Sequence, residues 1–358
     1  MKKFILNFIL FASVILLLVA LICIVTDPFN VFHPFNLRDN GVEPNKNYIK
    51  TKYVLANPDK FDSFLLGSSR VGSIHVDKIE SESCYNMTYS SATPMEDLDT
   101  LKVFIDNGII PRHIYLGLDH ESYMEPVETH KDSELRSQYI YSIEHPISFW
   151  AKYFSPSMVG NAIISTSLPY FTDSSIPHPL GESYSDIFYN YGWNFDYNYD
   201  SPSMPSSSPE LLEECHYGML CYSEMWENLF DNSEYANMSA ALDSIQEIVN
   251  ICEDNNIELT VFTHATWYTT FTEGVSQRYL VFLKRLSEIT PYYNFSGFND
   301  ITTNPYNYID IHHYNAEVGD LILDAICYNK TTPELLSQGF GMFVNKDNVD
   351  DLIEILLS

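Results

Sequence analysis

The sequence predicts an α/β protein in which a parallel central sheet is covered by helices on both faces. The first observation is a short apolar run, Phe64-Leu65-Leu66, that ends at Gly67, as in strands buried on both faces. The second is that further runs of this kind alternate with helical stripes along the chain, the order typical of parallel sheets. The third is that 358 residues, 45% of them hydrophobic, suffice for a sizeable core.

Residues 1–26 predict a transmembrane anchor. Residues 4–25 carry no charged side chain, and as a helix they are about 33 Å long at ~1.5 Å per residue, enough to cross a hydrocarbon core of roughly 30 Å. Lys2 and Lys3 precede this run and the next basic residue is Arg38, so we expect a cytoplasmic N-terminus and an extracytoplasmic main domain. A cleaved signal peptide is the alternative, but the run is long and no small-residue cleavage site follows it.

The rest of the chain divides into three parts. Residues 27–60 contain four prolines among scattered polar residues and are interpreted as a stalk or linker. Residues 61–330 are expected to form the α/β domain. Residues 331–358 are interpreted as a C-terminal tail that ends in a short amphipathic helix over 347–357.

The first half of the domain predicts three strands and one helix. The strands are expected at 62–66, 84–89 and 113–118. The helix follows a capping box, in which Thr93 is the N-cap, Pro94 the first helical residue and Glu96 the acid that completes the box. Gly108 ends this helix.

A long insertion is expected at about 121–232, where no regular period is found and tyrosines cluster between 184 and 199. Regular structure then resumes. It comprises a strand at 257–262 and helices at 238–253, 275–289 and 318–327.

Composition excludes some partners. With 48 acidic and 19 basic residues the formal charge is -29, which repels phosphate backbones, so nucleic acid is excluded as the main partner. The 26 tyrosines favour contacts with sugar rings. Six cysteines include no CxxC pair and no His/Cys cluster at zinc spacing, so we expect no structural metal and no cofactor. Cys215 and Cys221 could close a small disulfide loop in an oxidising compartment.

Candidate catalytic residues follow the predicted strands. The carboxyl ends of parallel strands share one edge of a sheet, and Ser69, Asp119 and His264 each stand at such an end. A loop near the C-terminus adds Asp310 and His313, so a serine nucleophile, an imidazole base and an orienting carboxylate could meet there.

Each of these assignments has an alternative. A Gly-Ser-Ser run after a strand is also a common helix N-cap. His312 could replace His313 as the base, but the Asp-x-x-His spacing favours His313. His264 is either a substrate contact at the sheet edge or a structural imidazole.

The two end blocks resemble the SGNH (GDSL-like) hydrolase superfamily. They are Leu-Gly-Ser-Ser-Arg at 66–70 and Tyr-Ile-Asp-Ile-His-His-Tyr at 308–314, followed by Glu-Val-Gly-Asp at 317–320. The likeness is greatest to the membrane-anchored AlgJ/AlgX-like and DltD-like branch. This resemblance implies a three-layer α/β/α flavodoxin-like fold, with Ser69 as nucleophile and with Asp310 and His313 as its partners.

The chain departs from the superfamily pattern at three positions. Ser68 stands where many members have aspartate, although a serine there resembles the DltD-like branch. The second block, which supplies a backbone N–H to the oxyanion hole, falls at 90–92, so Ser91 is the candidate donor. The third block supplies an asparagine N–H in the superfamily, whereas this chain has Asp119, a carboxylate that repels an oxyanion unless it is protonated.

The resemblance implies a bacterial, single-pass membrane enzyme: a serine esterase or O-acyltransferase acting outside the cytoplasm on O-acyl groups of a cell-envelope polysaccharide. An integral-membrane acyl-donor protein is the implied partner, and the tyrosine-rich insertion would hold the polymer. Hydrolysis and transfer are not distinguished by the sequence. The alternative is a non-catalytic protein that keeps the fold to bind glycan or to scaffold an export complex, and Asp119 in the oxyanion position favours it.

Overall fold

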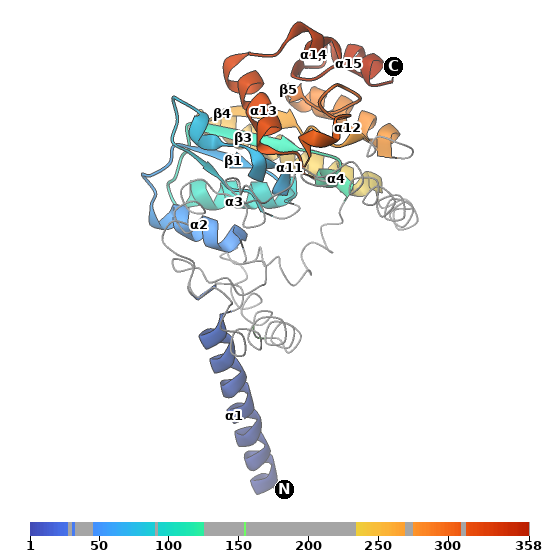
Figure 1. Cartoon of the computed structure of the whole chain (residues 1–358). Coiled ribbons are helices and arrows are strands. Elements are labelled where there is room, and N and C mark those ends of the chain that lie inside the picture. Colours follow the sequence, from blue (N-terminus) through green and yellow to red (C-terminus); the bar gives the residue numbers. More distant parts are fainter. Residues whose placement is uncertain are drawn as a thin grey trace. The chain divides into compact units, whose positions relative to one another are not determined.

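The structure is a computed structural model of the whole chain (Figure 1). It describes residues 1–27, 31–32, 46–89, 92–124, 154, 234–268, 275–308 and 313–357. The chain divides into two units, one formed by residues 1–56 and 131–187 and the other by residues 57–130 and 188–358.

The first unit begins with helix α1 (Lys2–Thr26), which is long and apolar enough to cross a membrane. Its side chains are mostly exposed, as expected of a helix that meets lipid rather than a protein core. Asp27 is the C-cap residue of this helix. Its carboxylate accepts hydrogen bonds from the backbone N–H groups of Val31 (2.8 Å) and Phe32 (2.9 Å). Part of the predicted stalk is helical, since α2 spans Lys46–Ala56, a stretch without proline.

The second unit contains a mixed sheet of six strands in the order β2-β1-β3-β4-β5-β6. Neighbouring strands from β2 to β5 are parallel, and β6 pairs antiparallel with β5. The strands are β1 (Ser63–Leu66), β2 (Cys84–Asn86), β3 (His113–Leu118), β4 (Glu258–Thr263), β5 (Tyr292–Asn294) and β6 (Met342–Val344). The expected α/β class is therefore confirmed, but the sheet is mixed and not wholly parallel.

Helices lie on both faces of this sheet (Figure 1). On one face α11 (Glu234–Asn255) lies between α3 (Pro94–Asp106) and α12 (Val275–Ile289). Successive side chains of β1 point to opposite faces of the sheet. Phe64 packs against Phe104 of α3, with ring centroids 4.7 Å apart, while Leu65 joins the core on the side of α13 (Ala316–Tyr328). The remaining helical segments are α4 (Glu121–Met124), α14 (Pro333–Ser337), α15 (Val349–Leu357) and the 3₁₀ turns η1 (Ser69–Ser73), η2 (Val76–Lys78) and η6 (Pro305–Asn307).

The predicted capping box opens α3. The backbone N–H of Thr93 donates to Glu96 Oε2 at 2.8 Å, and Pro94 is the first helical residue. The helix ends at Asp106, before Gly108 with φ +78°. A sequence signature of four residues therefore located this helix correctly.

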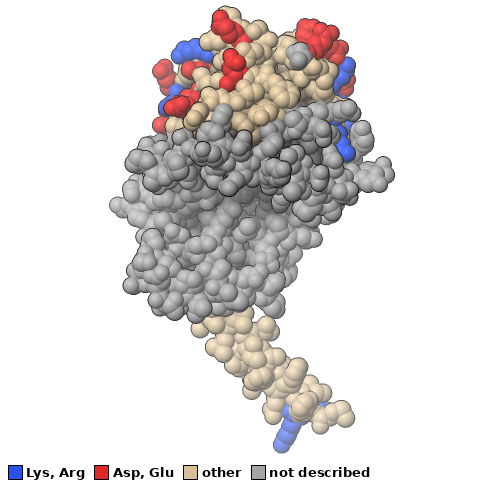
Figure 2. Space-filling view, turned by 45° about the vertical axis from the view of Figure 1, so that its right-hand side comes forward, with Lys and Arg blue, Asp and Glu red and all other residues tan. Residues whose placement is uncertain are grey.

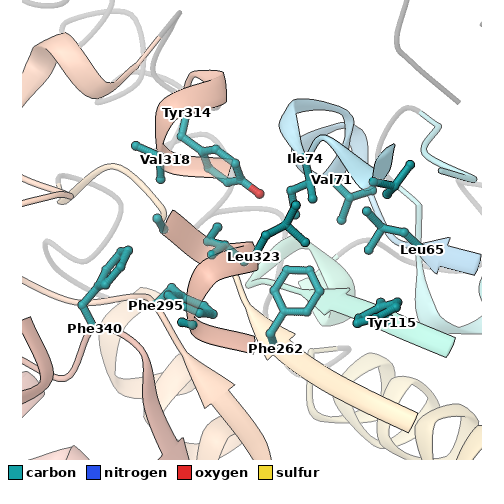
Figure 3. Close-up of a cluster of buried hydrophobic side chains, with 14 of the residues drawn as sticks. Leu65, Val71, Ile74, Tyr115, Phe262, Phe295, Tyr314, Val318, Leu323 and Phe340 are labelled. Atoms are coloured by element: carbon teal, nitrogen blue, oxygen red, sulfur yellow. The ribbon is translucent and has the colours of Figure 1, made fainter. Parts of the chain in front are cut away.

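A large hydrophobic cluster fills the space between the sheet and α13 (Figure 3). Leu65, Tyr115 and Phe262 from three adjacent strands meet Val318 and Leu323 of α13. The same cluster contains side chains from η1 and from the segment before α13, namely Val71, Ile74 and Tyr314. The core therefore directly supports two segments that carry predicted catalytic residues.

The C-terminal residues complete this unit and do not form a separate tail. Strand β6 extends the sheet, with Tyr292 opposite Val344. The predicted terminal helix is present as α15, and its Leu352 is fully buried. The interpretation of residues 331–358 as a tail outside the domain was therefore wrong, because it missed a three-residue strand.

Most of the predicted insertion, including Cys215 and Cys221, lies outside the described residues. Within the described ranges, Cys23, Cys84, Cys252 and Cys327 are free thiols. On the face seen in Figure 2, Asp and Glu side chains are interspersed with Lys and Arg over the described surface.

Candidate active site

The predicted nucleophile lies on a tight turn at the carboxyl end of β1. Gly67 has φ +141°, and a Cβ there would lie 2.9 Å from the carbonyl oxygen of Gly117 on β3 and 2.9 Å from Val71 Cγ1. Only glycine fits such a backbone so close to its neighbour. After this turn the chain enters the 3₁₀ helix η1 at Ser69, not an α-helix.

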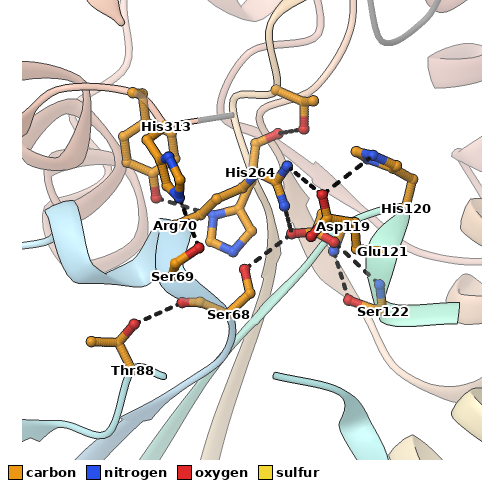
Figure 4. Close-up of polar contacts among 12 residues, drawn as sticks. Ser68, Ser69, Arg70, Thr88, Asp119, His120, Glu121, Ser122, His264 and His313 are labelled. Carbon is orange, nitrogen blue, oxygen red and sulfur yellow. Dashed lines mark hydrogen bonds and ion pairs between the residues drawn. The ribbon is translucent and has the colours of Figure 1, made fainter. Parts of the chain in front are cut away.

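The hydroxyl of Ser69 lies 2.8 Å from Nε2 of His313 (Figure 4). These residues are 244 positions apart in sequence, and both side chains are partly exposed. The contact expected between the two end blocks is therefore present. A hydroxyl held at this distance can pass its proton to an imidazole nitrogen as the oxygen attacks an electrophile.

Three predicted residues lie outside the described ranges: Asp310, the alternative base His312, and the oxyanion candidate Ser91. Tyr308 and Tyr314, described residues on either side of Asp310 and His312, pair in an antiparallel bridge.

Asp119 forms a buried ion pair with Arg70. The Nη1 atom of Arg70 donates to Asp119 Oδ2 at 2.6 Å, and its Nη2 donates to Glu121 Oε1 at 3.0 Å. Arg70 and Asp119 are 2% and 1% exposed. Burial alone would raise the pKa of Asp119, but the Arg70 guanidinium outweighs it and the pKa lies below its ordinary value. The carboxylate is therefore ionised, and its charge is balanced by Arg70.

The same carboxylate also binds the residue before the nucleophile. The Ser68 hydroxyl donates to Asp119 Oδ2 at 3.2 Å, and the backbone N–H of Ser122 donates to Oδ1, also at 3.2 Å. Ser68 is the N-cap of η1 but makes no side-chain capping bond. Ser68 therefore occupies the predicted N-cap position, but its hydroxyl bonds to Asp119 across the sheet and does not cap η1.

The end of β2 fixes the turn from the other side. Thr88 Oγ1 donates to the Ser68 carbonyl oxygen at 2.8 Å, and the amide of Asn86 donates to the Val71 carbonyl oxygen at 2.7 Å. Thr88 N–H in turn donates to Asn86 Oδ1 at 2.9 Å. The backbone on both sides of Ser69 is thus held by the side chains of Asn86 and Thr88.

His264, at the end of β4, is fully buried and lies against the same site. Its Nδ1 is 3.0 Å from the hydroxyl of Tyr314, the residue after His313. Burial lowers the pKa of His264 to about 3, so the imidazole is neutral at physiological pH. Of the two sequence interpretations, this environment fits a structural imidazole and not a solvent-exposed substrate contact.

Sequence reasoning assigned no role to Arg70, Asn86, Thr88 or Tyr314. The signal for Arg70 was present, because a basic residue directly after a buried strand and turn needs a carboxylate partner. The other three act through hydrogen bonds to backbone atoms or to a buried ring, for which the sequence carries no pattern. Among the described residues, no group of three or more His, Cys, Asp or Glu side chains is arranged to hold a metal ion.

Comparisons with family models, with curated proteins and with solved structures give no match to this chain. Support for a function therefore comes from the geometry of the site around Ser69 and His313 and from the resemblance of residues 66–70 and 308–314 to the SGNH pattern.

Proposed function

We propose that this protein is a membrane-anchored serine esterase or O-acyltransferase that acts outside the cytoplasm on O-acyl groups of a bacterial cell-envelope polysaccharide. The observation that carries this proposal is the 2.8 Å contact between Ser69 Oγ and His313 Nε2. The resemblance of both segments to the SGNH superfamily supports the acyl chemistry and the glycan substrate, and α1 supports the membrane anchor.

The reaction would begin with attack of Ser69 Oγ on the acyl carbonyl carbon while His313 Nε2 takes the hydroxyl proton. The tetrahedral intermediate collapses as the C–O bond to the sugar breaks, and His313 returns the proton to the departing sugar oxygen. The acyl group is then bound to Ser69. Water or a second sugar hydroxyl attacks this ester and gives its proton to His313. The bond between the acyl carbon and Ser69 Oγ then breaks, and His313 returns the proton to Ser69 Oγ.

Two supporting roles complete this mechanism. Asp310 is expected to hold the imidazole so that Nε2 faces Ser69. The backbone N–H of Ser69, and that of Ser91, are the candidate donors to the oxyanion. Asp119 is not proposed as an oxyanion contact, because both of its oxygens already accept hydrogen bonds. The alternative of a non-catalytic protein depended on a carboxylate at the oxyanion position, and Arg70 pairs with this carboxylate in the structure.

Labelling with a fluorophosphonate probe tests the proposal. In detergent, we expect the full chain to be labelled and the Ser69→Ala variant to remain unlabelled and to lose hydrolysis of aryl acetates. Ser287→Ala is the matched control, because its hydroxyl is partly buried on α12, donates to the Lys284 carbonyl oxygen, and lies outside the site. If wild type and Ser69→Ala are labelled equally, Ser69 is not the reactive serine, and the alternative of a non-catalytic binding or scaffold protein is favoured.

A second assay separates hydrolysis from transfer. The acyl-enzyme is formed with an aryl acetate in the presence of a soluble oligosaccharide. Free acetate as the sole product indicates an esterase, whereas acetylated oligosaccharide indicates a transferase.

A further inference from the structure

Tyr314 is anchored at two atoms directly after the proposed base. Its carbonyl oxygen accepts the Ser73 hydroxyl at 2.8 Å, and its own hydroxyl lies 3.0 Å from His264 Nδ1. Ser73 is the last residue of η1, which begins at Ser69. The backbone that carries His313 is therefore tied to the turn that carries Ser69, and its neighbouring side chain is tied to the end of β4.

The direction of the bond between Tyr314 and His264 depends on which nitrogen of the imidazole carries the proton. Tyr314 is fully buried, and within the described part of the chain its hydroxyl has no acceptor other than His264 Nδ1. A neutral imidazole accepts at one nitrogen and donates at the other. A hydroxyl that donates to Nδ1 puts the His264 proton on Nε2, a buried nitrogen that has no hydrogen-bond partner among the described residues.

The surroundings of His264 keep the ring neutral. Burial is the main cause, since it disfavours the charged form. Among its charged neighbours, Arg70 and His313 also oppose protonation, whereas Asp119 and Glu121 favour it. Since Asp119 and Glu121 are both bonded to Arg70, their effect on His264 is reduced.

Gly117 on β3 provides the space for the ring. A Cβ at this position would lie 2.8 Å from His264 Nε2 and 2.7 Å from Val71 Cγ1 of η1. Both distances are shorter than a normal carbon contact, so His264 and η1 pack against the bare Cα of one glycine. The distance between the end of β4 and the nucleophile turn is thus set by a residue without a side chain.

We infer that Tyr314 and His264 are positioning residues that hold His313 at hydrogen-bonding distance from Ser69, with the Tyr314 hydroxyl donating to Nδ1 of neutral His264 across the space left by Gly117. This inference rests on the proposed function for its catalytic consequence, but not for the contact itself. Proton transfer between Ser69 and His313 depends steeply on their separation. Loss of the Tyr314 hydroxyl should therefore slow the chemical step without weakening substrate binding.

The contact is tested by NMR of the full chain in detergent, with ¹⁵N in the histidine rings. His264 signals are assigned by their loss in His264→Gln. We expect His264 to show a protonated Nε2 and an accepting Nδ1, unchanged between pH 5 and 8. In Tyr314→Phe we expect the Nδ1 shift of His264 to change. A wild-type His264 that titrates in this range, or that carries its proton on Nδ1, would overturn the inference without any variant.

Kinetics test the catalytic consequence. A well-placed general base contributes roughly 10²–10⁴-fold to the rate. For Tyr314→Phe we expect to lose a part of this, so that kcat for an aryl ester falls roughly tenfold, while KM stays within about twofold of the wild-type value. Tyr292→Phe is the matched control, because Tyr292 is fully buried on β5 and donates to the Leu283 carbonyl oxygen at 3.3 Å. We expect its kinetic constants to match wild type.

The outcomes separate the inference from the proposed function. If Ser69→Ala loses labelling but Tyr314→Phe keeps wild-type kcat, the positioning role of Tyr314 is wrong, and the proposed enzymatic function is still supported. If wild type is not labelled, the proposed function is wrong, and NMR still decides the contact. Gly117→Ala should perturb both the His264 signals and kcat, and a Gly117→Ala variant that leaves both unchanged would also overturn the inference.

Discussion

The buried ion pair between Arg70 and Asp119 offers a quantitative test of how the nucleophile turn is held. Its atoms lie 2.6 Å apart, and both side chains are almost fully buried. The Asp119→Asn substitution keeps the shape of the side chain but removes its charge, while Arg70 keeps Glu121 as a carboxylate partner at 3.0 Å. Removing one member of a buried pair costs roughly 3–5 kcal/mol. Because Glu121 still balances part of the charge, we expect a loss of about 3 kcal/mol in the free energy of unfolding.

Thermal unfolding of the full chain in detergent measures this loss. For a folded unit of this size, about 3 kcal/mol corresponds to a fall in Tm of roughly 6–12 °C. Asp350→Asn is the matched control, because it breaks the exposed pair between Asp350 and Lys284 at 2.8 Å, and exposed pairs contribute little. If Asp119→Asn lowers Tm no more than Asp350→Asn does, the reasoning that the Arg70 pair stabilises this turn is refuted.

The same variant should also lose activity, because Ser68 and Arg70 flank Ser69 and both bind Asp119. A small displacement of a catalytic group has a large kinetic effect, so we expect kcat to fall about tenfold or more. Arg70→Lys should behave similarly, since a single ammonium group does not reproduce the two-pronged contact with Asp119 and Glu121. Wild-type kcat in a folded Asp119→Asn protein would show that the ion pair is structural only.

Three further predictions concern the turn, the buried imidazole and the anchor. Gly67→Ala should abolish fluorophosphonate labelling and lower Tm, because φ +141° and a Cβ 2.9 Å from the Gly117 carbonyl oxygen allow no side chain; full labelling would contradict this. His264 has a pKa of about 3 when folded and about 6.5 when unfolded, so the unfolded chain binds more protons between these values. The stability that depends on neutral His264 is complete above pH 6.5 and falls by about 1.4 kcal/mol per pH unit below it, and urea unfolding of His264→Gln should show a shallower pH dependence than wild type. Intact mass of the membrane-extracted protein should include residues 1–26, whereas a mass lacking them would identify α1 as a cleaved signal.

The fold could be predicted where a strand or helix carried its own signal. Strands β1 and β3 are buried along their whole length, β4 is buried over its last three residues, and α3 has a capping box, so local sequence was sufficient. Strands β5 and β6, of three residues each, were missed, whereas β2, which is equally short, was predicted as part of a longer run at 84–89. They are strands because each pairs with a neighbour that is distant in sequence, a property of the whole fold.

The site shows the same division. Ser69 and His313 were predicted to meet because strand ends in a parallel sheet share one edge, a rule that needs no knowledge of side-chain contacts. Asp119 was placed at that edge correctly, but its partner was not foreseen. The Arg70–Asp119 contact joins residues 49 positions apart, and only the structure shows that both are buried and therefore must pair.

Two of the chain's departures from the SGNH pattern compensate for each other. In the superfamily pattern the acid stands before the nucleophile serine and an uncharged asparagine stands in the third block, whereas here Ser68 is uncharged and Asp119 is the acid. The structure joins these two positions, with the Ser68 hydroxyl donating to Asp119 Oδ2 at 3.2 Å, and Arg70 balances the charge in its new place. Under the proposed function, the carboxylate of Asp119 is therefore not an unpaired charge beside Ser69, because Ser68 and Arg70 both donate to it.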